Sequence, residues 1–186
     1  FVMERFTIQK NDFLSHDCTG YFHLYYVGYG QPGNPDYLNI LKNIFVSTHP
    51  DTLRAASRQS AALMIQDIPQ VMDAEGLNEA ILMAVPRSKS GMCNWQLGFK
   101  AAVRTTVKAL QADGLSVIDG TDFIFRHTST KMTHLRKPVT NFTNTGSDPY
   151  LGITKDTCDI HNEYIKGRTI ILIDDIYTKT VNVDED

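Results

Sequence analysis

The fold is decided by one stretch near the end of the chain, Thr169-Ile170-Ile171-Leu172-Ile173-Asp174-Asp175-Ile176-Tyr177-Thr178-Lys179-Thr180-Val181-Asn182. Four apolar residues run directly into two adjacent carboxylates, and a loop rich in hydroxyl groups follows. A continuous run of Ile and Leu of this length predicts a strand buried on both faces, as in a parallel sheet. The two carboxylates then lie just past the carboxyl end of the strand, where open α/β sheets bind ligands.

An acidic strand end followed by a loop of threonines suits a phosphorylated sugar. Carboxylates can hold ribose hydroxyls or the waters of a Mg²⁺ ion, while N–H groups and hydroxyls of the loop cradle a phosphate. The plain alternative is a buried strand that ends in two solvated aspartates. A receiver domain needs its acids on an early strand, and a Walker B strand needs an upstream G-x-x-x-x-G-K-[ST] loop. The sequence meets neither condition.

The stretch resembles the phosphoribosyl-pyrophosphate (PRPP) signature of the type I phosphoribosyltransferases, and residues 170–178 match its order of apolar and acidic positions. The resemblance implies a type I phosphoribosyltransferase-like α/β fold, a mostly parallel sheet flanked by helices. It gives Asp174 and Asp175 the catalytic role of orienting the ribose hydroxyls. The residues that it assigns to the 5-phosphate are Thr178, Lys179, Thr180, Val181 and Asn182.

The phosphate loop departs from that family in one respect. The family usually has Thr-Thr-Gly-Ala-Thr, whereas residues 178–182 contain no glycine. A backbone that approaches a phosphate closely must then do so without glycine's conformational freedom. Lys179 offsets this by adding a positive charge. The departure keeps open a binding module without turnover.

A second apolar run, Ala80–Val85, predicts another buried strand, and it empties into the basic, small-residue loop 86–91. Positive charges with Ser and Gly directly after a buried strand favour an anion site over a solvated turn. The segment is similar to the loop with which type I phosphoribosyltransferases hold pyrophosphate, and it is closest to the ComF-like, or amidophosphoribosyltransferase-like, branch. The residues assigned to pyrophosphate are Arg87, Ser88 and Lys89.

Residues 127–138 are polar and basic and show no periodicity. The resemblance implies a mobile flap here that closes over the substrate; an ordinary long connection is an equal alternative. We predict a strand near 150–154 after it.

The remaining pattern alternates helices and strands, which supports α/β architecture. Residues 1–78 are predicted to form an N-terminal α+β extension and residues 79–186 the phosphoribosyltransferase-like core. The expected helices are 36–45, a helix that starts at the capping pattern of 48–51 and runs to 66 or 71, and 94–114. The expected strands besides those above are 21–29, 115–118 and 122–126.

Composition sets the remaining bounds. The chain has 186 residues, a formal net charge of −3 and three widely spaced cysteines. This predicts a cytoplasmic protein with reduced thiols, and it does not indicate nucleic acid as a partner. No apolar run approaches the roughly 20 residues of a membrane helix. The chain begins at Phe1 and stops just after the phosphate loop, so we expect a fragment whose core is truncated at its C-terminus.

The resemblance implies a Mg²⁺-dependent transferase of nucleotide metabolism, a glycosyltransferase that moves 5-phosphoribosyl from PRPP to a nitrogen nucleophile, a base or an amine, and releases pyrophosphate. The Mg²⁺ ion would be held through PRPP and waters near the acid pair, without a direct protein ligand. A homo-oligomer or a larger complex is compatible with this activity. Two alternatives stay open: a non-catalytic PRPP- or nucleotide-binding module of a regulatory or defence complex, and a transferase that docks a macromolecule on its aromatic N-terminal region.

Overall fold

In the computed structural model, residues 3–27, 31–42, 49–132, 140, 143–148 and 153–177 are described. Their central element is a three-stranded sheet of order β4-β3-β7. Strand β3 (Ala80–Ala84) pairs in parallel with β4 (Val117–Asp119) on one side and with β7 (Ile170–Ile173) on the other. Both apolar runs that the sequence predicts to be strands do form strands, and they are parallel neighbours in this sheet.

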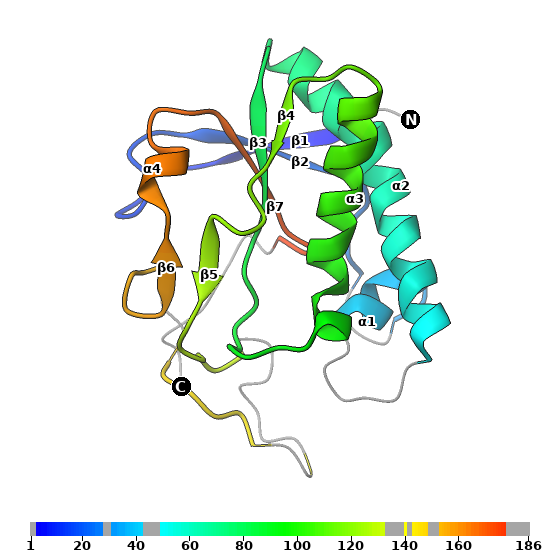
Figure 1. The fold of residues 1–186 in the computed structure, drawn as a ribbon, viewed down its shortest axis with the longest axis vertical. Coiled ribbons are helices and arrows are strands. Elements are labelled where there is room, and N and C mark those ends of the chain that lie inside the picture. The colour runs from blue at the N-terminus through cyan, green and yellow to red at the C-terminus, as the bar shows by residue number, and fades with distance from the viewer. Residues whose placement is uncertain are drawn as a thin grey trace.

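Two long helices cover one face of this sheet (Figure 1). Helix α2 (Pro50–Ala74) packs along α3 (Gly98–Ala112), which follows a short 3-10 helix, η1 (Asn94–Leu97). Alternate residues of β3 point into the core that the helices form, because successive side chains of a strand face opposite sides. The buried residues of that core are Ala61, Met64, Ile68, Met72, Ala80, Leu82, Ala84, Ala102, Val103, Val107, Leu110 and Val117.

Helix α2 shows how the local sequence sets an element. Pro50 occupies the first turn, where its missing N–H costs nothing, and the side chain of His49 accepts a hydrogen bond from the N–H of Asp51. The helix therefore begins one residue later than the capping pattern suggests. It runs on to Ala74, past the predicted end, and the core that α2 shares with β3 and α3 joins residues 1–78 to the sheet.

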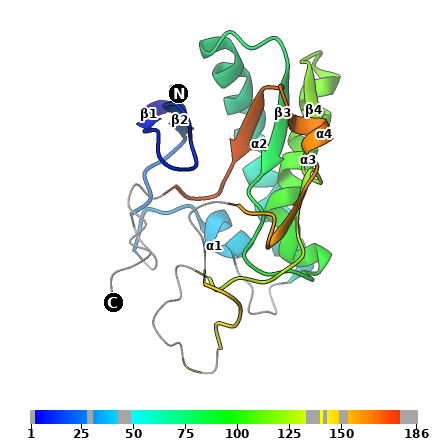
Figure 2. The same ribbon diagram turned by 90° about the vertical axis from the view of Figure 1, so that its left-hand side faces the viewer.

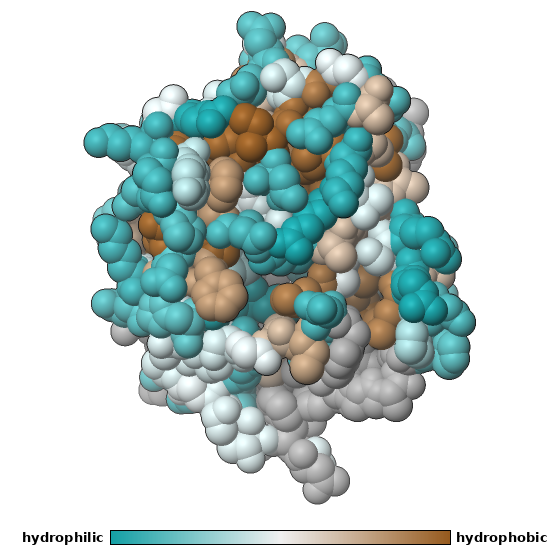
Figure 3. All heavy atoms as spheres, in the orientation of Figure 1, coloured by the Kyte–Doolittle hydropathy of each residue, from teal (hydrophilic) through white to brown (hydrophobic). Residues whose placement is uncertain are grey.

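The opposite face of the sheet lies under smaller elements. Figure 1 shows β5 (Ile124–Arg126), β6 (Cys158–Ile160) and the single-turn α4 (Asn162–Ile165) on the other side of β3 from the helices. Strands β5 and β6 pair antiparallel. At the level of α4, Figure 3 shows a band of hydrophobic side chains at the surface, with hydrophilic ones below it. On this face Ile81 and Met83 of β3 are fully buried, whereas their partners Ile170 and Leu172 on β7 are exposed.

The N-terminal part forms an antiparallel hairpin of β1 (Glu4–Ile8) and β2 (Cys18–Phe22), followed by α1 (Asp36–Lys42). Figure 2 shows β7, β3 and β4 side by side, with the hairpin beyond β7. The hairpin is tied to α2, because the hydroxyl of Tyr21 donates to Glu75 at 2.5 Å.

Several sequence predictions need correction. The strand predicted at 21–29 ends at Phe22, and residues 24–27 form no strand and are exposed. Aromatic residues favour strands because their side chains pack well on a half-buried pleated sheet. This segment has no partner strand among the described residues, so that packing is missing. In the strand predicted at 150–154, residues 153 and 154 are not in a strand and the others lie outside the described residues. The strands β1 and β6 were not predicted.

The largest correction concerns β7. Its Ile171 and Ile173 pack against the core, but Ile170 is 38% and Leu172 55% exposed, so the strand is not buried on both faces. The physical reason is its place at the edge of the described sheet, with no helix of the described residues over its outer face. None of the described helices is both long and apolar enough to cross a membrane.

Candidate functional site

The topology of the sheet creates the site. Strand β3 lies in the middle, and the chain first adds β4 on one side and later β7 on the other. The connections that leave the carboxyl ends of β3 and β7 therefore diverge, and ligands of open α/β sheets bind at such a switch point. The basic loop after β3 and the acid pair after β7 both start at this edge, since Ala84 is in register with Ile173.

The acid pair is linked through the backbone. The N–H of Asp175 donates to a carboxylate oxygen of Asp174 at 2.8 Å. The pKa of Asp174 is raised to about 7 by desolvation and by the negative charge of Asp175. Asp174 keeps contact with solvent although protein atoms surround it, so its desolvation is partial. Asp174 can therefore hold a proton at a higher pH than an ordinary aspartate does.

A cation from a distant segment meets this pair. The ammonium of Lys42, at the end of α1, lies 3.4 Å from a carboxylate oxygen of Asp175. Its charge opposes the upward shift in the pKa of Asp174. Sequence reasoning missed Lys42, because a lysine at the end of a short helix carries no signal of a partner so far along the chain.

The guanidinium of Arg87 is bound to main-chain carbonyls. It donates to the carbonyl of Leu41 at 3.1 Å, of Lys42 at 2.9 Å and of Gln96 at 3.0 Å. Desolvation lowers the pKa of Arg87, and the charge of Asp175 opposes that shift. Arg87 therefore lies within electrostatic reach of the acid pair, but its hydrogen bonds fasten the end of α1 and η1 to the loop after β3.

The next residues of the loop hold the segment predicted to be a flap. The N–H of Thr130 donates to the carbonyl of Ser88 at 2.7 Å. The ammonium of Lys89 donates to the carbonyl of Thr130 at 2.9 Å and to that of Thr145, and desolvation lowers its pKa. The start of the predicted flap, residues 127–132, is thus joined to the predicted pyrophosphate loop. Residues 133–138 lie outside the described residues, and their predicted mobility stays a prediction.

An aromatic contact connects the N-terminal hairpin to the acid pair. The ring of Phe6, on β1, lies 4.6 Å from the ring of Tyr177, two residues beyond Asp175. Tyr177 is 51% exposed, so one part of its ring faces solvent. The hairpin therefore borders the candidate site, which no sequence pattern indicated.

Two predicted parts of the site are not described. The 5-phosphate residues 178–182 lie outside the described residues, and their role stays a prediction. No group of three or more His, Cys, Asp or Glu side chains that could hold a metal occurs within the described ranges. The predicted Mg²⁺ needs no such group, since it would be held through PRPP and waters. The oxygens of Asp174 and Asp175 suit those waters, because Mg²⁺ prefers oxygen ligands and keeps part of its hydration.

The fold and site define an α/β protein with a parallel sheet whose switch point carries an acid pair and a basic loop. No family model, curated protein or solved structure matches the chain.

Proposed function

We propose that the chain binds PRPP at the switch point between β3 and β7 and transfers its 5-phosphoribosyl group to a nitrogen nucleophile. The observation that carries the proposal is the register of the two strands: Ala84 and Ile173 are partners, so the loops with Arg87 and Asp174 leave the same edge of the sheet. A sugar that carries phosphates at two ends needs both loops at once.

The roles follow from charge. In the transfer, the bond from C1 of the ribose to the pyrophosphate oxygen breaks, and its electron pair leaves with pyrophosphate. The lone pair of the acceptor nitrogen forms the new bond to C1, and the proton of that nitrogen passes to pyrophosphate or water. Positive charge develops on the ribose, and the carboxylates of Asp174 and Asp175 stabilise it electrostatically. Bound Mg²⁺ would neutralise charge on the leaving pyrophosphate. The loop of residues 86–91 offers N–H groups and hydroxyls to that pyrophosphate, and residues 178–182 offer theirs to the 5-phosphate.

A second candidate is a module that binds PRPP or a nucleotide without turnover. The observation that favours it is the placement of two cations of the loop. Arg87 and Lys89 donate hydrogen bonds to main-chain carbonyls, so fewer of their N–H groups can donate to a leaving pyrophosphate. The glycine-free loop at 178–182 points the same way.

Binding and turnover are tested separately. For both candidates, PRPP with Mg²⁺ should raise the melting temperature in scanning calorimetry, since a ligand that binds only the folded state stabilises it. No shift at millimolar ligand would remove both. Pyrophosphate release with a panel of nucleobases and amines then separates them.

The decisive variant carries Asp174→Asn and Asp175→Asn together. Its matched control is Asp73→Asn with Asp113→Asn, two exposed aspartates at the ends of α2 and α3. A transferase loses pyrophosphate release in the first variant and keeps it in the control. Absence of release in the wild-type protein with every acceptor would leave the binding module.

A further inference from the structure

A cavity of about 130 Å³ borders the candidate site and shares with it the loop after β3. Its walls come from the end of β3 and the loop after it, η1, the start of α3, the turn after β4 and β5. Neither Asp174 nor Asp175 lines it. The proposed transfer assigns the shared loop to pyrophosphate, and it gives no role to the walls from η1, α3, the turn after β4 and β5.

Most of the wall is apolar, with side chains such as Val85, Leu97, Phe99 and Ile124. The volume is close to that of an engineered apolar cavity of about 150 Å³ that takes up benzene. The cavity therefore suits a body the size of one six-membered ring.

The charges in the wall all have one sign. Arg87, Lys89, Lys100 and Arg126 line the cavity, and no Asp or Glu does so among the described residues. Arg87 and Lys89 donate to main-chain carbonyls, which carry no net charge to neutralise them. Of these four cations, Lys100 alone forms an ion pair with a carboxylate of the described residues, Asp122, at 2.6 Å, and Arg87 also lies within electrostatic reach of Asp175. The wall thus keeps a positive potential that an anion can neutralise.

Arg126 is the cation whose terminal amino groups are available to a ligand. Its Nε donates to the carbonyl of Arg87 at 2.6 Å, which fixes the plane of the guanidinium. Its two terminal amino groups make no hydrogen bond to any residue that the structure describes, and the side chain is half-buried. A guanidinium fixed on one side and open on the other matches a carboxylate, which accepts two parallel hydrogen bonds.

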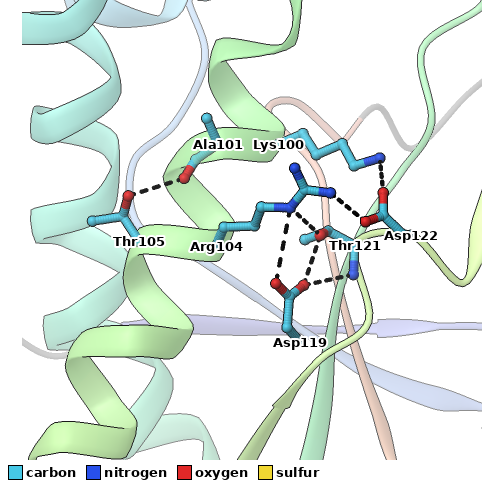
Figure 4. A network of polar contacts seen from close by, with 7 residues as sticks. All are labelled: Lys100, Ala101, Arg104, Thr105, Asp119, Thr121 and Asp122. Carbon is cyan, nitrogen blue, oxygen red and sulfur yellow. Dashed lines mark hydrogen bonds and ion pairs between the residues drawn. The ribbon is translucent and has the colours of Figure 1, made fainter. Parts of the chain in front are cut away.

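The wall opposite the loop is braced. Figure 4 shows Arg104 reaching from α3 to the turn after β4, where its Nε donates to the hydroxyl of Thr121 at 2.8 Å. That hydroxyl donates to Asp119 at 2.6 Å, and Lys100 and Arg104 both pair with Asp122. The pKa of Asp122 is lowered, first by the hydrogen bond from Lys100. Contacts from α3 to Asp119 and to Asp122 hold the turn at both of its ends. The cavity wall is therefore ordered without a ligand, and binding costs less conformational entropy of the protein.

We propose that this cavity binds a small aromatic carboxylate, with its ring against the apolar wall and its carboxylate on the free amino groups of Arg126. This binding needs neither PRPP nor Mg²⁺, so a titration without them tests it separately from the proposed transfer.

The test is a titration of the whole chain, without PRPP or Mg²⁺, followed by amide chemical shifts. Three probes separate the two features of the ligand: benzoate has ring and charge, benzyl alcohol the ring alone, and acetate the charge alone. We expect benzoate to shift the amides of Leu97, Phe99, Thr121 and Phe125 saturably and to bind about tenfold more tightly than either other probe, the scale of a charge-assisted contact. Equal binding of the three probes, or no saturable shift at about 10 mM benzoate, overturns the proposal.

A variant then assigns the anchor. Arg126→Gln keeps a donor for the carbonyl of Arg87 but loses the charge, and it should weaken benzoate binding about tenfold while leaving benzyl alcohol unchanged. Arg58→Gln, with the same change of charge on the exposed side of α2, should leave both unchanged. Unchanged benzoate affinity in a folded Arg126→Gln protein refutes the proposal. If that variant does not fold, the pattern of shifts in the wild-type chain decides alone.

Discussion

The ammonium of Lys42 lies 3.4 Å from a carboxylate oxygen of Asp175, and this ion pair joins the end of α1 to the end of β7. The side chains are 34% and 25% exposed, so the pair is partly shielded from water. Arg87 supports the same junction from the other side through the carbonyls of Leu41 and Lys42. A short N-terminal helix therefore sets the charge at the switch point of the sheet.

Replacing Lys42 by Met should raise the pKa of Asp174 further above its ordinary value, since the lysine charge now opposes the shift. Carbon-13 chemical shifts of the Asp174 carboxyl, followed against pH, measure this directly. Unfolding free energy should change by no more than about 1 kcal/mol, the range of a partly exposed ion pair. Lys108→Met, at an exposed position of α3, is the control and should leave the Asp174 titration unchanged. An unmoved titration in both proteins would show that Lys42 does not act on the acid pair.

Stability should fall as the pH rises from about 4 to about 7 because of Asp174. Its pKa is near 4 in the unfolded chain and about 7 in the folded one. The folded state thus binds more protons in this window, so the stability that protonated Asp174 contributes is complete below pH 4 and lost by about pH 7. Solvent contact at Asp174 limits the size of the effect.

The free energy of unfolding in urea, measured for the wild-type protein and for Asp174→Asn between about pH 4 and pH 8, tests this pH dependence. Asparagine cannot ionise and can still accept the hydrogen bond from the N–H of Asp175. The variant should therefore gain stability relative to wild type between pH 4 and 7, with a constant difference above pH 8. Parallel curves across the whole range would contradict a raised pKa.

Loss of the Arg87 guanidinium should be costly even without ligand. Three carbonyls at the end of α1 and in η1 would lose their donor, and a hydrogen bond to a charged group contributes about 1.5–3 kcal/mol. We expect Arg87→Met to lower the free energy of unfolding by about 2–4 kcal/mol, measured by urea denaturation. Arg58→Met should change it by less than about 0.5 kcal/mol, as usual for a surface site. Equal, small effects would mean that Arg87 is solvated.

Much of the sheet could be predicted because the signals were local. The apolar run at Ala80–Val85 and that at Ile170–Ile173 each have strand length, and each ends in a charged loop that marks the carboxyl end of its strand. Helix α3 carries apolar side chains at helical spacing and ends at Ala112, just before Gly114, whose φ of 87° favours glycine.

The contacts that complete the site could not be predicted, because they join residues distant in sequence without any pattern. Lys42 meets Asp175, and Phe6 meets Tyr177, only once the N-terminal hairpin and α1 have packed beside β7. The hydrogen-bond partners of Arg87 and Lys89 could not be predicted from the sequence for another reason. Both side chains donate to main-chain carbonyls, and every residue type carries one.

The burial of β7 offers the sharpest comparison between sequence and structure. Leu82 of β3 is 0% exposed and Leu172 of β7 is 55% exposed, although both belong to apolar runs of the same kind. Leu82→Ala should cost about 2–5 kcal/mol, because it opens a cavity in the core. Leu172→Ala should cost about 1 kcal/mol or less, because over half of the side chain is already in water. Urea denaturation of both variants measures the difference. Two large and similar losses would mean that β7 is covered on its outer face in solution, and the sequence-based prediction of a strand buried on both sides would then stand.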